Sequence, residues 1–180
     1  MLRILAYLIS IVGANVITAS IQPLHLGIFL VPAGTFIVGA TFVLRDLVQN
    51  RIGRNKTYLC ILTALILSAV ISKALGDTLL IVAASAVSFC VSETTDTEIY
   101  SRLNLSMAWR VAISGLFGGT LDSTIFVLIG LSPLGAGFLP WSAVPAAIIG
   151  QIIVKSIMQV IGAFILGRIL ARRTIQSAES

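Results

Sequence analysis

The chain has 180 residues, of which 57% are hydrophobic and 11% are charged, and its mean hydropathy is +1.04. Soluble domains carry about a quarter charged residues, so these values exclude an ordinary soluble domain and predict an integral membrane protein. The formal net charge is +5, but the basic residues lie near the ends of apolar segments, where they set orientation in a bilayer. We therefore do not expect nucleic acid as a partner.

The apolar segments are each about twenty residues long, which is the length that an α-helix needs to cross a bilayer. Turn-forming residues such as Gln22-Pro23 and Gly76-Asp77 separate them. We predict an all-α integral membrane protein whose single domain, residues 1–180, is a bundle of six transmembrane helices. The predicted helices are 2–20, 26–47, 58–75, 78–100, 107–131 and 141–170. We expect the first segment to remain as a helix and not to be removed as a signal peptide, because the orientation pattern requires it.

Basic residues near the helix ends are distributed unequally between the two sides of the predicted bundle. Lys73 is alone on one side. The other side collects Arg3, Arg45, Arg51, Arg54, Lys56, Arg102, Arg110, Arg168, Arg172 and Arg173. Because positively charged connections stay in the cytoplasm, we predict a multi-pass protein of the cell membrane with both termini cytoplasmic.

Four polar residues fall deep inside the predicted helices, where an ionised group costs about 2.5 to 3.5 kcal/mol on insertion scales. Counted from the outer helix ends, Glu93 and Lys155 lie at similar depths, roughly 22 and 21 Å. Asp122 and Gln151 lie less deep, at roughly 13 and 15 Å. The count predicts two polar layers, and an error of a few residues in the helix ends would merge them into one site.

Helical spacing places further residues beside these four, since residues three, four and seven apart share a face. Asp96 shares a face with Glu93, whereas Glu98 lies off that face, so we interpret Glu98 as the polar end of its helix. For Asp96 both interpretations stay open. Arg45, Asp46 and Gln49 follow the apolar part of segment 26–47, and we interpret them as a cytoplasmic helix end.

Carboxylates, a carboxamide, an amine and aromatic rings suit a small, polar, planar solute. The carboxylates accept from its N–H groups, Gln151 and Lys155 donate to its carbonyl group, and rings stack on its face. A nucleobase-like molecule fits this description, although composition alone equally allows a vitamin or an amine. Glu93 and Asp122 could instead form buried structural pairs with Lys155.

Four motifs in order carry a resemblance to a known family. They are "FVLRDLVQNRIGR" (42–54), "VSETTDTEIYSRL" (91–103), "SGLFGGTLDSTIFVLIG" (114–130) and "GQIIVKSIMQ" (150–159). Together they resemble the VUT family, also called queuosine precursor transporters. The resemblance implies a six-helix bundle related to the substrate-binding subunits of energy-coupling-factor transporters. It also implies uptake of 7-cyano-7-deazaguanine or its aminomethyl relative, with Glu93, Asp96, Asp122, Gln151 and Lys155 facing the substrate.

Other function classes find less support in the sequence. The chain has no His-Glu-x-x-His pair, no Gly-x-Ser-x-Gly turn and no Gly-x-x-x-x-Gly-Lys phosphate loop. We expect no enzyme, no cofactor and no metal. The alternatives are uptake of another vitamin-like solute and a non-transporting membrane scaffold held together by small-residue faces at Gly115 and Gly119. Energy would come from an ion gradient, from a separate coupling subunit, or from downstream metabolism of the solute. For an ion gradient, protonation of Glu93 or Asp122 is a candidate step. A homo-oligomer is also possible.

Overall fold

The computed structural model describes residues 1–178, with side chains described as far as Ile165 and at Arg168. Its helices are α1 (Leu2–Ser20), α2 (Thr35–Ile52), α3 (Arg54–Ala74), α4 (Leu79–Arg102), α5 (Met107–Ile125) and α6 (Val144–Ala178). A π-helical segment, η1 (Phe126–Leu131), continues α5, and two short strands, β1 (Leu24–Leu26) and β2 (Phe29–Val31), form an antiparallel hairpin between α1 and α2.

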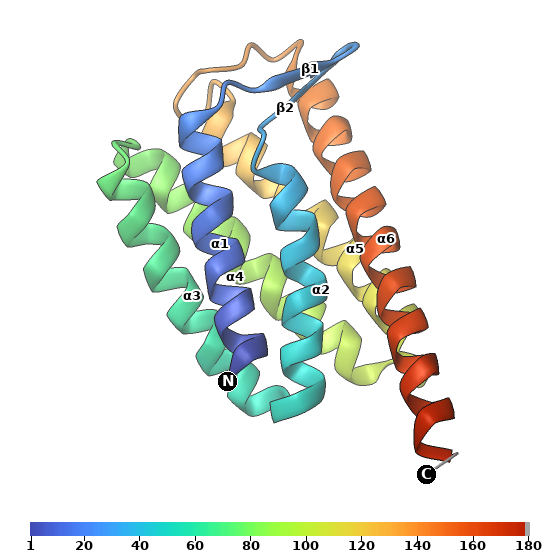
Figure 1. Ribbon diagram of the computed structural model, residues 1–180. Coiled ribbons are helices and arrows are strands. Elements are labelled where there is room, and N and C mark those ends of the chain that lie inside the picture. Colours follow the sequence, from blue (N-terminus) through green and yellow to red (C-terminus); the bar gives the residue numbers. More distant parts are fainter. Residues whose placement is uncertain (179–180) are drawn as a thin grey trace.

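Successive helices run in alternating directions, so both chain ends lie at one end of the bundle (Figure 1). We call this the terminal end. The β-hairpin and the connection before α6 lie at the other end, which we call the hairpin end. Helix α2 lies inside the arrangement, in contact with α1 and α6, while α4 packs against both α3 and α5.

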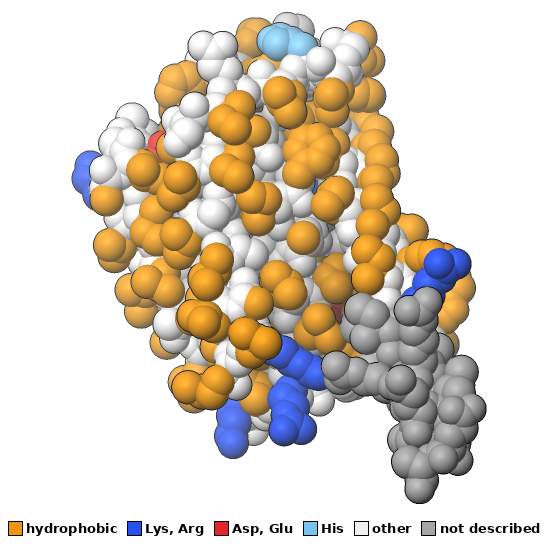
Figure 2. All heavy atoms as spheres, in the orientation of Figure 1, with side chains coloured by type: hydrophobic (Ala, Val, Ile, Leu, Met, Phe, Trp, Pro, Cys, Tyr) orange, Lys and Arg blue, Asp and Glu red, His pale blue; other side chains and the backbone are white. Residues whose placement is uncertain are grey.

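The outer surface of the bundle is apolar. Large hydrophobic side chains such as Leu62, Phe117 and Ile157 are exposed on three different helices, and Figure 2 shows hydrophobic groups over the sides of the molecule with several basic groups at the terminal end. Within the described residues, five helices are long and apolar enough to cross a membrane, namely Leu2–Ser20, Arg54–Ala74, Leu79–Arg102, Met107–Leu131 and Val144–Ile165. These are the features of a multi-pass helical membrane protein.

The predicted helix 26–47 is wrong at both ends. Its first part forms the hairpin, in which Leu26 pairs with Phe29 and Gly27 takes a positive φ of 63°, as the first position of a two-residue hairpin loop often requires. Pro32 then follows the second strand, and α2 begins only at Thr35. A short apolar run has the same hydropathy in a strand as in a helix, so hydropathy could not distinguish the hairpin from the start of a helix.

The true α2 ends at Ile52, five residues beyond the predicted end, and α3 begins at Arg54, four residues before the predicted start. Only Gly53, with a φ of 80°, separates the two helices. The polar run after residue 47 is therefore helical except at Gly53, and within it Gln49 and Thr57 are buried while residues 53–56 are exposed. The last helix likewise runs to Ala178 instead of residue 170. Arg172 and Arg173, counted for orientation, have side chains that lie outside the described residues.

Small residues let the helices approach closely inside the bundle. A Cβ atom at Gly115 would overlap the carboxamide of Gln159, and one at Gly39 would lie 2.6 Å from Cβ of Met158. Gly119 faces Lys155 in the same way, at ordinary contact distance. Gly115 and Gly119 thus serve contacts with α6 within the chain, and do not form an outward face that could hold a partner.

Candidate functional site

A cavity of about 550 Å³ lies inside the hairpin half of the bundle. Its upper wall includes Pro23, Asp77 and Phe138 from connections at the hairpin end, and its floor includes Phe42 and Glu93. The volume is within the range of about 300 to 1,000 Å³ that is typical of small-molecule sites. The cavity therefore extends from the hairpin end to the middle of the bundle.

The walls of the cavity differ in chemistry. Phe42, Phe89 and Phe126 supply aromatic rings from α2, α4 and η1. Helix α4 also contributes a row of hydroxyl groups, from Ser85, Ser88 and Ser92. A planar solute that is apolar on its faces and polar at its edges would meet matching groups on both kinds of wall.

Lys155 organises the polar group on the α5–α6 side. Its Nζ donates to Oδ2 of Asp122 at 2.6 Å, to Oγ of Ser123 at 2.8 Å and to Oε1 of Gln151 at 3.4 Å. An ammonium group has three donors, so this amine has none left for a solute. Gln151 is in the opposite situation, because its Nε2 is buried and has no hydrogen-bond partner among the described residues.

This arrangement corrects the predicted layers, which placed Lys155 with Glu93. The side chain of Lys155 instead reaches Asp122 and Gln151, which were assigned to the other layer. A helical side chain points toward the N-terminus of its own helix, and the N-terminus of α6 is at the hairpin end. The amine is therefore nearer to the hairpin end than a count of backbone positions indicates.

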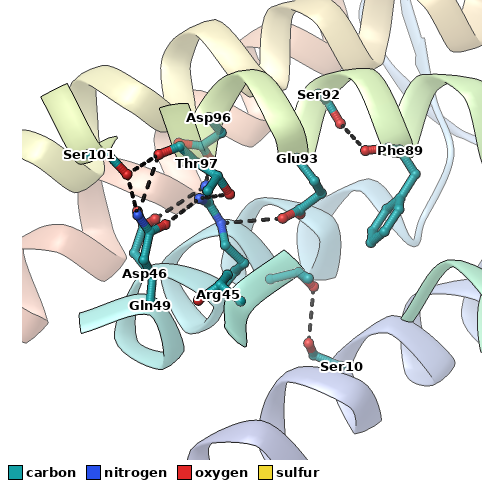
Figure 3. Close-up of polar contacts among 12 residues, drawn as sticks. Ser10, Arg45, Asp46, Gln49, Phe89, Ser92, Glu93, Asp96, Thr97 and Ser101 are labelled. Carbon is teal, nitrogen blue, oxygen red and sulfur yellow. Dashed lines mark hydrogen bonds and ion pairs between the residues drawn. The ribbon is translucent and has the colours of Figure 1, made fainter. Parts of the chain in front are cut away.

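Arg45 organises a second polar group between α2 and α4, which we call the Arg45 cluster: Arg45, Asp46, Gln49, Glu93, Asp96, Thr97 and Ser101 (Figure 3). The guanidinium group pairs with Asp46 at 3.2 Å, with Glu93 at 3.3 Å and with Asp96. It also donates to Gln49 at 3.1 Å and to the Thr97 hydroxyl at 2.9 Å. Gln49 in turn donates to the Ser101 hydroxyl at 2.9 Å.

The structure brings four of the five predicted site residues to the cavity: Glu93, Asp122, Gln151 and Lys155 line it. Asp96 does not. It lies one turn further along α4 and is fully buried against Arg45. Glu93 belongs to both places, since it lines the cavity and pairs with Arg45. Glu98 lies apart from the cluster and contacts Tyr58, Arg54 and Arg102 at the surface.

The interpretation of Arg45, Asp46 and Gln49 as a helix end is wrong. Arg45 and Asp46 have no exposed side-chain surface, and Gln49 is buried. The error follows from the helix boundaries, because an α2 that runs to Ile52 carries Arg45 almost two turns into the bundle. One feature of the sequence could have indicated that Arg45 is buried. Glu93 and Asp96 share a face of one helix, and two buried carboxylates need more positive charge than Lys155 alone supplies.

Comparison with known proteins gives a family for these residues. Residues 69–169 match a family described as "Putative vitamin uptake transporter". The chain belongs to this family. The match covers more than half of the chain and includes all five predicted site residues, and it confirms, at the level of the family, the resemblance carried by the sequence motifs. Neither the search of curated proteins nor the search of solved structures found a match.

Proposed function

We propose that this protein takes up a queuosine precursor, 7-cyano-7-deazaguanine or its aminomethyl relative, into the cytoplasm. The observation that carries the proposal is a single cavity, inside a membrane bundle, that joins aromatic rings to a carboxylate and an unpaired carboxamide donor. Membership of a family of vitamin uptake transporters supports a small organic solute as the cargo.

The hydrogen-bonding groups match the edge of a guanine-like ring. Such an edge offers neighbouring N–H donors, which one carboxylate can accept side by side, and a carbonyl oxygen. Asp122 and Glu93 are the carboxylates at the cavity, and Nε2 of Gln151 is a donor without a partner among the described residues. Because Lys155 has used all three donors, we assign the carbonyl contact to Gln151 and the positioning of Asp122 and Gln151 to Lys155.

The shape of the cavity supports a direction of transport. The cavity reaches the hairpin end, and the Arg45 cluster fills the space between α2 and α4 on the other side of Glu93. The basic residues near the terminal end favour that end as cytoplasmic. The structure then corresponds to a state open to the outside, and uptake requires a second arrangement that opens the terminal end.

The energy for uptake has its source outside this chain. The sequence has no phosphate loop, so energy comes from a gradient, from trapping by metabolism, or from a coupling subunit of the kind that serves energy-coupling-factor transporters. We propose an architecture of six membrane-crossing helices related to the substrate-binding subunits of those transporters. The sixth crossing is α2, whose charged residues Arg45 and Asp46 are shielded inside the bundle.

Uptake in cells that cannot make the precursor tests this function. We expect expression of the protein to restore uptake of labelled 7-cyano-7-deazaguanine, and Asp122→Asn to abolish it at equal membrane expression. Glu98→Gln is the matched control, since Glu98 is a carboxylate outside the cavity. Adenine, which lacks the carbonyl group and the paired donors, should not compete. Uptake that is indifferent to Asp122 would contradict the proposed site, and competition by a different planar vitamin would identify the second candidate cargo.

A further inference from the structure

The charges of the Arg45 cluster do not balance. One guanidinium group faces the carboxyl groups of Asp46, Glu93 and Asp96, and all four side chains are 2% exposed or less. If every carboxyl group were ionised, two negative charges would remain without a counter-charge. The cluster lies about 10 Å from the end of α2, within the apolar part of the bundle. Each unpaired charge in such surroundings costs several kcal/mol.

The other charged groups nearby do not supply the missing charges. Lys155 is paired with Asp122. The positive charge of Arg110 on α5 acts on Asp46 from a distance. Arg110 makes no ion pair with Asp46, and it donates a hydrogen bond to the backbone oxygen of Tyr100 at 3.0 Å. Tyr7 on α1, Cys60 on α3 and Tyr100 on α4 are further titratable neighbours, and all three are neutral near pH 7. Even if Arg110 offsets one charge, another remains.

Unpaired atoms give a second, independent sign that the cluster is incomplete. Among the described residues, Oδ2 of Asp46 and Oδ1 of Asp96 are buried and lack both a hydrogen bond and an ion pair. A proton on a carboxyl group supplies a donor and removes a charge, so it answers both deficits at once.

We propose that the Arg45 cluster holds at least one proton on its carboxyl groups and that this proton crosses the membrane together with the solute. The proposal rests on the proposed function, and it differs from a proton on Asp122, whose charge Lys155 already balances.

Glu93 provides the link between solute and proton, because it belongs to both the cavity and the cluster. A solute that donates to Glu93 favours the ionised form of this carboxyl group. An ionised Glu93 makes ionisation of Asp96 and Asp46 less favourable, so a bound solute strengthens the binding of a proton to these two aspartates. By thermodynamic reciprocity a proton on Asp46 or Asp96 strengthens the binding of the solute by the same factor.

Purified protein in liposomes loaded with a pH-sensitive dye tests the proposal. With valinomycin and potassium to clamp the membrane potential, we expect external 7-cyano-7-deazaguanine to cause acidification inside the vesicles, and adenine to cause none. Asp46→Asn and Asp96→Asn each replace a carboxyl group with a neutral amide and should lose the proton signal. Glu98→Gln, in an exposed ion pair, should keep it.

An infrared measurement addresses the proton without any solute. A protonated carboxyl group has a carbonyl band distinct from that of a carboxylate, so we expect this band in the wild-type protein at neutral pH and in Glu98→Gln, with its loss or reduction in Asp46→Asn or Asp96→Asn. Solute uptake without acidification would overturn the coupling and leave the proposed function intact. Absence of the band would overturn the protonated cluster. Failure of solute to enter wild-type vesicles would contradict the proposed function, while the infrared band still decides the proton.

Discussion

Lys155 and Gln151 divide the hydrogen-bonding work on one side of the cavity. Lys155 gives its three donors to Asp122, Ser123 and Gln151. The carboxamide of Gln151 is thereby oriented with its oxygen toward the amine, and its nitrogen stays without a partner among the described residues. A buried donor of this kind discriminates strongly for a solute that carries an acceptor at the matching position.

We predict that Gln151→Leu weakens binding of 7-cyano-7-deazaguanine by about tenfold or more. Without the amide the solute carbonyl is buried unpaired, which costs about 1 to 3 kcal/mol. Equilibrium binding to the purified protein measures the effect. The matched control is Gln159→Leu, because Gln159 is also buried on α6, lies eight residues further on and does not line the cavity. Equal losses for both variants would show that the effect comes from the fold and not from the contact.

Among the secondary-structure elements, the β-hairpin and α6 pack closely against each other. A Cβ atom at Gly150 would lie 2.7 Å from Cβ of Phe29 and 3.0 Å from Cγ2 of Val31. The hairpin side therefore rests directly on the α6 backbone. Leu30, between these two strand residues, lines the cavity, so this contact fixes part of the cavity wall.

We predict that Gly150→Leu reduces uptake and lowers stability by about 1 to 3 kcal/mol, the usual cost of overpacking. The larger side chain must push the hairpin away from α6 and deform the cavity wall. Uptake and the thermal unfolding of the detergent-solubilised protein measure the two effects. Gly13→Ala on α1 is the control, because a Cβ atom there meets nothing within 4 Å. Unchanged uptake in Gly150→Leu would show that the hairpin has no part in the cavity.

The π-helical segment η1 also contributes to the cavity. It continues α5 directly and includes Phe126, whose ring lines the cavity only four residues from Asp122. The wider helical turn is seen in the bond from the Ser132 amide to the Val127 carbonyl, five residues earlier. π-Helical turns are frequent at functional sites, and here one begins at Phe126, at the wall of the cavity.

For the whole molecule we predict that the hairpin end faces outward and the terminal end faces the cytoplasm. His25→Cys and Lys56→Cys test this, since His25 lies in the hairpin and Lys56 near the start of α3, and both are exposed. With Cys60 and Cys90 replaced by Ser, a membrane-impermeant maleimide should label His25→Cys in intact cells. It should label Lys56→Cys only after permeabilisation. The reverse pattern would invert the proposed orientation.

The sequence by itself determined the class of the molecule and the family. Hydropathy and charge are sums over neighbouring residues, so they indicate a helical membrane protein and locate most segments without knowledge of packing. The same property made Glu93, Asp122 and Lys155 conspicuous, because an ion at depth is costly wherever it points. The four motifs carried the family, which the match over residues 69–169 confirms.

Only the tertiary structure decided how these residues are paired. Because α2 continues to Ile52, Arg45 lies at the centre of a buried cluster and not at a helix end. That placement joined Asp96 to Arg45 and left it outside the cavity lining, while the reach of the Lys155 side chain brought the amine to Asp122. The physical reason is that hydropathy depends on local composition. Ion pairing depends instead on which sides of the helices pack against each other and on how far their side chains extend.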